Sequence, residues 1–331
     1  MAIAPAVPGS RLRLRTPEDY DLPRDVCSYG YFLLAPNDWS PADQAFRTTL
    51  DLTTASAERQ ATTVVVRQPS GRGGELVCRF DRMLDRAQQT QARARLTRML
   101  RLDESREALK AFHRVDPRWR RSGRGRLFRS PTMFEDVIKT ITSCNVAWPN
   151  TINMNERLCE VLGSKSPSGF HAFPSPAKLA RTRPGTLRGR CRVGYRDTRI
   201  IAIAKLFKQG SLSENDIAAP SRTSEEVYKD LLALPGVGPY AAANIMQLLG
   251  RYDRLALDTE SVRHGRSTLG FTGEPPQVLK MLEAHYDAFG AQRFRSYWLE
   301  LWDDYEARRG PAHTWERETT GRTFTSVQLR D

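Results

Sequence analysis

The turn at residues 235–239 is the sequence feature that most constrains the fold. The stretch SEEVYKDLLALPGVGPYAAANIMQLLG places PGVGP between two apolar helical segments. Pro235 and Gly236 end the first helix, and Gly238 lets the backbone pass close to another surface. Pro239 suits the first turn of the next helix, where its missing N–H would be unpaired anyway. The pattern predicts a helical hairpin over about residues 224–250.

The backbone amides of this turn are suited to binding an anion. The N–H groups of Gly236, Val237 and Gly238 would lie beside the positive end of the second helix, in a concave arrangement of donors. A phosphate fits such a site, and backbone donors position a nucleic-acid strand without recognising its sequence. The alternative is a helix-turn-helix corner whose glycines only allow close packing.

The charge of the chain favours the first interpretation. There are 51 Lys and Arg residues against 38 Asp and Glu residues, which gives a formal net charge of +13. Such an excess attracts a polyanion through counterion release and long-range attraction. Nucleic acid is therefore the first partner to consider, although drift in composition would produce the same excess. We expect no membrane span, and a cytoplasmic protein or, in a eukaryote, a nuclear one.

The stretch that follows the hairpin carries a lone acid, Asp258, 18 positions beyond Tyr240. Together, LPGVGPYAAANI and LALDTESVRHG resemble the helix-hairpin-helix superfamily of DNA glycosylases, which includes endonuclease III, 8-oxoguanine glycosylase and 3-methyladenine glycosylase II. The segments SPTMFEDVIKTITSCNVAW and LRGRCRVGYRDTRIIAIAK resemble the family's first long core helix and its Gly-Tyr-Arg segment. The resemblance covers about residues 120–310. It implies a monomeric enzyme that acts on double-stranded DNA containing a damaged base.

The resemblance implies that Asp258 is the catalytic acid. Cleavage of an N-glycosidic bond builds positive charge on the sugar, and a fixed carboxylate can stabilise that charge and orient the attacking water. Asp258 also precedes a helical turn, so helix capping is the alternative role, and the two roles are compatible. Glu260 and His264 follow in the same turn, where we expect a helix-start role for Glu260 and packing or phosphate binding for His264, with participation in catalysis as the alternative for each.

Tyr240 occupies the position at which bifunctional members of the family carry a nucleophilic lysine. The resemblance therefore implies hydrolysis by water without strand cleavage. Tyr240 could bound or stack on the flipped base, or it could be a core aromatic residue. Trp148 is a second candidate for the base pocket, with packing as its alternative role.

Further DNA contacts are predicted on three other segments. Asn145, near the end of the first core helix, is the candidate for the side chain that fills the gap left by the flipped base. Tyr195 and Arg196 are predicted to position the strand, with a purely structural role as the alternative, and Arg263 is predicted to contact DNA. The basic run from Arg118 to Arg126 is a further candidate for phosphate contact. The segment RFRSYWLELW supplies an aromatic stripe at helical spacing, which suits a core and, in family members, often lines part of the base pocket: Phe294, Tyr297, Trp298 and Trp302.

The five cysteines are scattered, and none forms the close pairs that zinc or iron–sulfur sites need. The iron–sulfur branch of the family places four cysteines beyond its catalytic acid, whereas this chain has none after Cys191. We therefore expect no iron–sulfur cluster, no organic cofactor and no metal held by side chains. The hairpin carbonyls could hold a monovalent cation without any side-chain signature.

The pattern along the chain predicts an α+β fold. Residues 1–83 are typical of a small antiparallel β domain, with strands in SRLRLRT, CSYGYFLLA, AFRTTLDL and ATTVVVRQPSGRGGELVCRF. Residues 84–310 have helical periodicity and, by the resemblance, form a two-lobed helix-hairpin-helix core. Residues 311–331 are polar and aperiodic, and we expect this tail to fray.

Several functions remain open from the sequence. The leading hypothesis is monofunctional excision of an alkylated purine such as 3-methyladenine. Uracil or mismatched thymine is the alternative substrate, because a tyrosine at the lysine position also occurs in mismatch-directed relatives. A lyase that uses a lysine elsewhere in the chain is a further hypothesis. The competing class is a non-catalytic DNA-binding protein that kept the hairpin.

Overall fold

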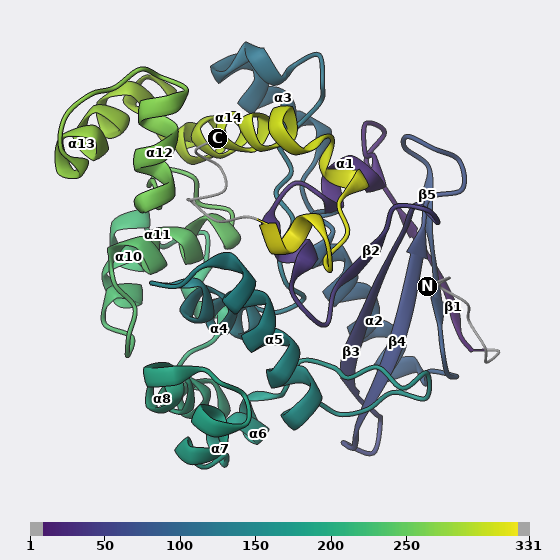
Figure 1. Ribbon diagram of the computed structural model, residues 1–331. Coiled ribbons are helices and arrows are strands. Elements are labelled where there is room, and N and C mark those ends of the chain that lie inside the picture. Colours follow the sequence, from purple (N-terminus) through teal and green to yellow (C-terminus); the bar gives the residue numbers. More distant parts are fainter. Residues whose placement is uncertain (1–8, 324–331) are drawn as a thin grey trace.

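A five-stranded antiparallel sheet forms one side of the molecule (Figure 1). The computed structural model describes residues 9–323. The strand order is β1-β5-β4-β3-β2, and Phe46 on β3 lies opposite Val66 on β4. The predicted α+β class is confirmed. The strands are β1 Arg11–Arg15, β2 Asp38–Ser40, β3 Ala45–Thr53, β4 Arg59–Arg67 and β5 Glu75–Phe80.

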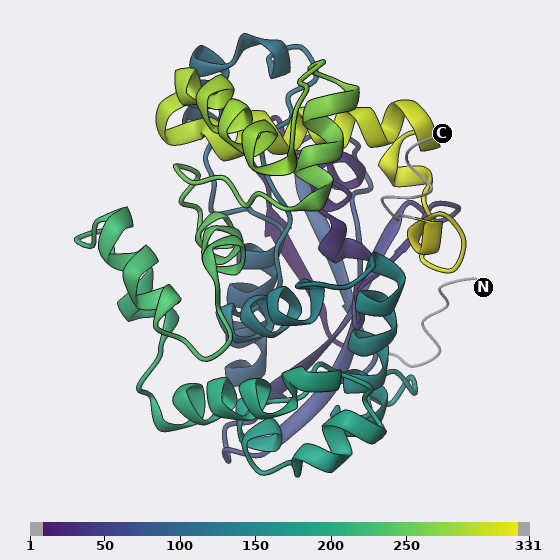
Figure 2. The same ribbon diagram turned by 60° about the vertical axis from the view of Figure 1, so that its left-hand side comes forward.

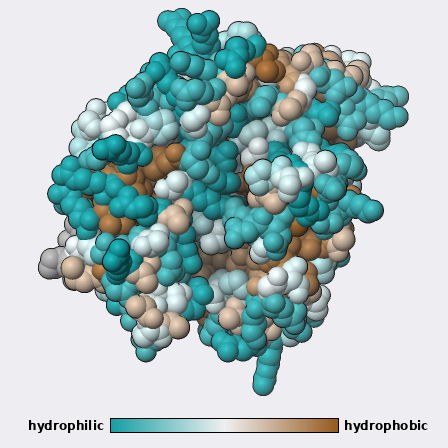
Figure 3. All heavy atoms as spheres, turned by 180° about the vertical axis from the view of Figure 1, so that it is seen from behind, coloured by the Kyte–Doolittle hydropathy of each residue, from teal (hydrophilic) through white to brown (hydrophobic). Residues whose placement is uncertain are grey.

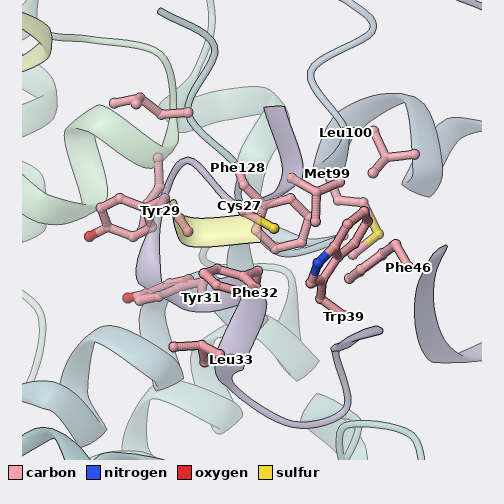
Figure 4. Packing of buried hydrophobic residues seen from close by; sticks show 14 of the residues in the cluster. Cys27, Tyr29, Tyr31, Phe32, Leu33, Trp39, Phe46, Met99, Leu100 and Phe128 are labelled. Atoms are coloured by element: carbon pink, nitrogen blue, oxygen red, sulfur yellow. The ribbon is translucent and has the colours of Figure 1, made fainter. Parts of the chain in front are cut away.

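One predicted strand is wrong. The segment CSYGYFLLA follows the short helix α1, Leu22–Val26, and forms the 3-10 turn η1, Gly30–Leu33. Its backbone bonds run from Phe32 N to Tyr29 O and from Leu34 N to Tyr31 O, each 3.1 Å long, in the three-residue spacing of such a turn. The side chains are buried in several directions, so the two-residue alternation of a strand is absent. Figure 4 shows Phe32 packed near Trp39, while the hydroxyl groups of Tyr29 and Tyr31 point away from that cluster.

Helices make up the rest of the chain. The boundary between sheet and helices falls between Phe80 and Arg86, and α2 packs against β3 and β1. The helices are α2 Arg86–Met99, α3 Arg106–Val115, α4 Met133–Ser143, α5 Trp148–Leu162, α6 Pro176–Ala180, α7 Pro184–Gly189, α8 Asp197–Gln209, α9 Glu214–Ile217, α10 Ser224–Leu232, α11 Pro239–Leu248, α12 Thr259–Ser267, α13 Pro275–Tyr286 and α14 Arg293–Arg309.

Two hydrophobic cores divide the molecule, in agreement with the two lobes that were predicted. One core joins the sheet and α2 to α12–α14, and the other joins α4, α5, α8 and α10. Figure 2 shows α12–α14 above and α6–α8 below, with α4 and α11 between them. Helix α11 contributes Ala243 and Leu248 to the first core and Ala242 and Ile245 to the second. The second helix of the hairpin therefore lies at the junction of the lobes.

The expectation that the C-terminal tail frays is wrong for residues 311–323. Trp315 is fully buried, with its ring 5.2 Å from that of Trp302. The backbone carbonyl of His313 accepts a hydrogen bond of 2.8 Å from the indole of Trp39, and Arg317 donates one of the same length to Leu33 O. This segment lies beside α1 and β2 (Figure 1). The aperiodic sequence hides the packing, because three-residue turns carry no helical pattern. Residues 324–331 of the predicted tail lie outside the described residues.

The surface seen from behind is mostly hydrophilic, with apolar atoms in small separate patches (Figure 3). Within residues 9–323, no helix combines the length and the apolar character that a membrane crossing needs.

Candidate active site

The predicted hairpin is present, formed by α10, the turn and α11. Gly236 has φ +81°, and a Cβ there would lie 2.5 Å from Cδ of Arg199, so the turn requires glycine. Gly236 and Gly238 are both exposed, which leaves this backbone accessible to a strand. The N–H of Val237 is not the free donor that the sequence predicted. Its side chain is buried and its N–H donates to Leu234 O at 3.1 Å, so that amide is already bound.

A cavity of about 960 Å³ opens beside the hairpin, between the two lobes. Its walls come from η1, the loop after α4, the start of α11, the loop before α12, and α14. Tyr240, at the start of α11, packs against both hydrophobic cores. The cavity brings together six of the predicted site residues: Asn145, Trp148, Gly236, Gly238, Tyr240 and Asp258.

Asp258 is the N-cap of α12, so the predicted capping role is confirmed. Its Oδ1 accepts hydrogen bonds from Glu260 N at 3.0 Å, from Ser261 N at 3.1 Å and from Ser261 Oγ at 3.2 Å. All three bonds end on one oxygen. Among the described residues, Oδ2 is the oxygen that remains for a group in the cavity. The cap therefore fixes the carboxylate while it borders the cavity.

Burial raises the pKa of Asp258 above its ordinary value, and the hydrogen bonds from Ser261 and Glu260 partly oppose this. The residue is reached by solvent from the cavity, but protein surrounds the carboxylate closely enough to desolvate it. A raised pKa makes the carboxylate a better proton acceptor than an exposed aspartate. Tyr240 lies nearby, and burial together with the charge of Asp258 raises the pKa of its hydroxyl well above the usual range. That hydroxyl is therefore neutral.

The cavity walls are aromatic. Asp258 and Glu260 are the charged side chains that line it, and no lysine or arginine does so within residues 9–323. The aromatic stripe predicted on α14 lines the cavity as well as packing in the first core. The aromatic lining residues are Tyr29, Tyr31, Trp148, Tyr240, Phe294, Tyr297, Trp298, Trp302 and Tyr305.

Comparisons with known proteins bear on this arrangement. No family model matches the sequence, and no curated protein sequence matches it. Among solved structures, the chain is similar to a 3-methyladenine DNA glycosylase from Archaeoglobus fulgidus. The TM-score is 0.66 at 18% identity, over 88% of this chain and 98% of the other. The chain has the DNA glycosylase fold.

A second similar structure has the same fold. It is the 8-oxoguanine glycosylase/lyase of Clostridium acetobutylicum in its apo form, with a TM-score of 0.65 at 18% identity, over 88% of this chain and 95% of the other. The same enzyme in complex with double-stranded DNA matches with a TM-score of 0.59 at 17% identity, over 85% of this chain and 93% of the other.

Within this glycosylase fold, the turn η1 contributes cavity residues that the sequence did not predict. Tyr29, Gly30 and Tyr31 line the cavity, and the ring of Trp298 lies 4.5 Å from that of Tyr29. A Cβ on Gly30 would lie 3.0 Å from Cζ2 of Trp148, so glycine lets that indole lie against the backbone. The sequence signal that could have identified these cavity residues is the aromatic and glycine content of SYGYF. That segment was predicted to be a strand.

Two predicted DNA contacts are corrected. Arg196 is buried, and its guanidinium donates to Ile141 O at 3.0 Å and to Cys144 O. Arg263 is also buried, and it pairs with Glu260 and, at 2.8 Å, with Asp304. Their charges are bound within the protein, so both residues have structural roles in this state. Asp304 and the backbone carbonyls that bind Arg196 come from distant parts of the sequence, which composition does not reveal.

Tyr195, in contrast, is half exposed outside the cavity. The guanidinium of Arg199 lies 4.9 Å from the centre of its ring, and Arg199 in turn lies against Gly236. This tyrosine therefore belongs to the same exposed surface as the hairpin turn.

Three of the five arginines in the basic run at residues 118–126 form ion pairs within the protein. Arg118 pairs with Asp116, and Arg124 pairs with Asp303 at 2.9 Å. Arg126 is buried, 3.0 Å from Asp19. Phosphate contact by these three side chains is therefore not supported.

The remaining titratable residues near Asp258 do not form a metal site. Within residues 9–323, no group of three or more His, Cys, Asp or Glu side chains is placed to hold a metal ion. His264, on α12, is fully buried, with Nε2 3.2 Å from the hydroxyl of Tyr286. The expected packing role of His264 therefore fits its position.

Proposed function

We propose that the protein is a monofunctional DNA glycosylase that hydrolyses the N-glycosidic bond of a damaged base turned out of double-stranded DNA. The observation that carries this proposal is the position of Asp258, whose carboxylate is fixed at the edge of an aromatic cavity that can admit a base, beside the exposed hairpin. A flipped base needs a pocket of this kind, and the sugar to which it is bonded needs a carboxylate at the rim.

The chemistry follows from that placement. The base enters between the aromatic walls, and C1′ of its sugar comes to lie near Oδ2 of Asp258. As the bond between C1′ and the base nitrogen breaks, its electron pair leaves with the base, and the carboxylate stabilises the positive charge on the sugar. A water molecule then attacks C1′, and Asp258 accepts its proton.

Water as the nucleophile is supported by the positions of the lysines. The sequence has eight, at 110, 139, 165, 178, 205, 208, 229 and 280, and none is among the residues that line the cavity. Lys139 is fully buried and bonds to Glu135 at 2.7 Å. A Schiff base needs an accessible amine beside C1′, so the described residues offer no obvious candidate for a lyase step.

The cavity lining favours an alkylated purine such as 3-methyladenine. Methylation on a ring nitrogen leaves the base electron-poor and positively charged. Such a base gains from aromatic faces through the cation–π interaction, and from nearby carboxylates. The lining supplies both features and no opposing lysine or arginine within the described residues.

We propose that the DNA strand crosses the exposed turn at Gly236 and Gly238, and that Asn145 reaches into the gap left by the base. Asn145 is exposed at the cavity rim and has φ +52°, a left-handed conformation that asparagine tolerates. The aromatic ring of Tyr195 would extend this contact surface. In this arrangement the protein acts as a monomer.

A panel of duplexes tests the function directly. Each duplex carries one modified base, among them 3-methyladenine, 7-methylguanine, uracil, mismatched thymine and 8-oxoguanine, and base release is scored with and without alkali. We expect release of a methylated purine, with strand breaks only after alkali. Release of uracil or thymine alone would overturn the assigned base class. Strand cleavage without alkali, together with borohydride trapping of a protein–DNA adduct, would overturn the monofunctional assignment. No release of any base would favour a binding protein.

A further inference from the structure

Behind Asp258, two hydroxyl groups connect its carboxylate to α14. Ser261 Oγ lies 3.2 Å from Asp258 Oδ1, and it also accepts a hydrogen bond of 2.9 Å from Asp258 N. The hydroxyl of Tyr297 lies 2.7 Å from the same Ser261 oxygen. Both residues are buried, so this line of contacts is shielded from bulk water.

The number of hydrogen atoms sets the direction of these bonds. Asp258 Oδ1 only accepts while it is ionised, so the single hydroxyl hydrogen of Ser261 goes to it. Ser261 Oγ must then accept from Asp258 N and from the hydroxyl of Tyr297. The hydrogen bonds therefore run from Tyr297 through Ser261 to the carboxylate, and each bond polarises the next.

We propose that Tyr297 and Ser261 are positioning residues, which form a hydroxyl relay that holds Asp258 ionised and fixed at the cavity rim. This proposal rests on the proposed function, because an ionised Asp258 is needed only if that residue takes part in base release. Burial alone favours the protonated form of an aspartate in this place, whereas the relay supplies donors that only the ionised form can fully use. Burial raises the pKa of Asp258, and the hydrogen bond from the Ser261 side chain lowers it.

The other titratable groups that face Asp258 do not substitute for the relay. Tyr240 on α11, Tyr29 before η1 and Tyr305 on α14 all have a pKa raised by burial, so they are neutral. Burial raises the pKa of Cys144, after α4, to about 11. Glu260, on α12, is paired with Arg263.

Three variants separate the relay from general packing. Ser261→Ala removes the donor to Oδ1, and Tyr297→Phe removes only the outer hydroxyl while the ring stays in the cavity wall. Ser267→Ala is the matched control on the same helix, because the Ser267 hydroxyl accepts from Arg263 at 3.1 Å and lies at the exposed end of α12. Tyr297→Phe keeps the proposal testable if Ser261→Ala fails to fold.

The experiment records the single-turnover rate of base release against pH for the three variants. Loss of a donor to a carboxylate favours its protonated form, so the acid limb should move to higher pH in Ser261→Ala and by less in Tyr297→Phe. At the acid end we expect the Ser261→Ala rate to fall about tenfold further than the wild-type rate, the effect of one hydrogen bond to a charged group. Ser267→Ala should follow the wild-type profile. Profiles for Ser261→Ala and Tyr297→Phe that superimpose on the wild type would overturn the relay.

A second readout is independent of catalysis. The carboxyl carbon of Asp258 is titrated by NMR in protein labelled with ¹³C-aspartate, and Asp258→Asn assigns its resonance. The titration should move to higher pH in Ser261→Ala, and an unchanged titration would overturn the relay. This measurement distinguishes a failure of the relay from a failure of the proposed function, because the NMR titration can shift even if no duplex releases a base.

Discussion

The hydroxyl of Tyr29 donates a hydrogen bond of 2.5 Å to Asn244 Oδ1, across 215 positions of the sequence. It links the N-terminal turn η1 to α11, the second helix of the hairpin, beside the cavity that both residues line. Asn244 in turn donates to Thr140 Oγ1 at 3.0 Å, which brings α4 into the same buried group. Three elements around the cavity are therefore tied together by one asparagine.

Tyr29→Phe should lower stability, because it leaves the buried Asn244 oxygen without its donor. We expect a loss of about 1–3 kcal/mol in the free energy of unfolding, measured by chemical denaturation. Tyr20→Phe is the matched control, since the Tyr20 hydroxyl is buried and makes no hydrogen bond among the described residues. Equal stability of the two variants would show that the Tyr29 bond contributes nothing.

Gly236→Ala should strain the hairpin, whereas Gly238→Ala should not. Gly236 is left-handed and lacks room for a Cβ, while Gly238 has φ −98° and no neighbouring atom within 4 Å of the place where a Cβ would lie. We expect Gly236→Ala to cost about 1–2 kcal/mol in stability. Duplex affinity, measured by fluorescence anisotropy, should fall by up to about tenfold. Equal effects of the two substitutions would contradict the required glycine conformation.

Trp315→Ala should destabilise the whole molecule although Trp315 lies in a segment without periodicity. The ring is fully buried and stacks 6.5 Å from Phe32, which belongs to η1. We expect a loss of about 3–5 kcal/mol, as for other buried tryptophans. The comparison is Met83→Ala, because Met83 is exposed and should change stability little. A small effect of Trp315→Ala in thermal unfolding would mean that residues 311–323 do not support the fold.

The rate of base release should depend on the ionisation of Asp258. Burial raises its pKa, and the reaction needs the carboxylate. The rate should therefore decline as the pH falls through that raised pKa, at a higher pH than an exposed aspartate would give. The folded state also binds this proton more readily than the unfolded chain does, so ionising Asp258 opposes folding. A rate that is constant throughout the acidic range would contradict this role.

The sequence allowed part of the site to be predicted, because that part is local. PGVG, Tyr240 and Asp258 belong to one stretch. Turn chemistry predicts the hairpin, and the resemblance to the glycosylase superfamily implies the roles of Tyr240 and Asp258. Tyr29 was missed because its cavity neighbours come from distant segments, and a short aromatic run does not distinguish a strand from a 3-10 turn. Arg263 was misassigned because its partner Asp304 lies on another helix. Periodicity identified the elements, but only tertiary packing shows which charges are already neutralised.

The most direct test of the account compares the wild type with Asp258→Asn. Asparagine caps a helix about as well as aspartate, so α12 should persist. Single-turnover release of the preferred modified base and affinity for the same duplex are measured on both proteins. We expect release to fall about a hundredfold to a thousandfold, with duplex affinity nearly unchanged. Release by Asp258→Asn at a rate close to that of the wild type would contradict the central claim that this carboxylate performs the hydrolysis.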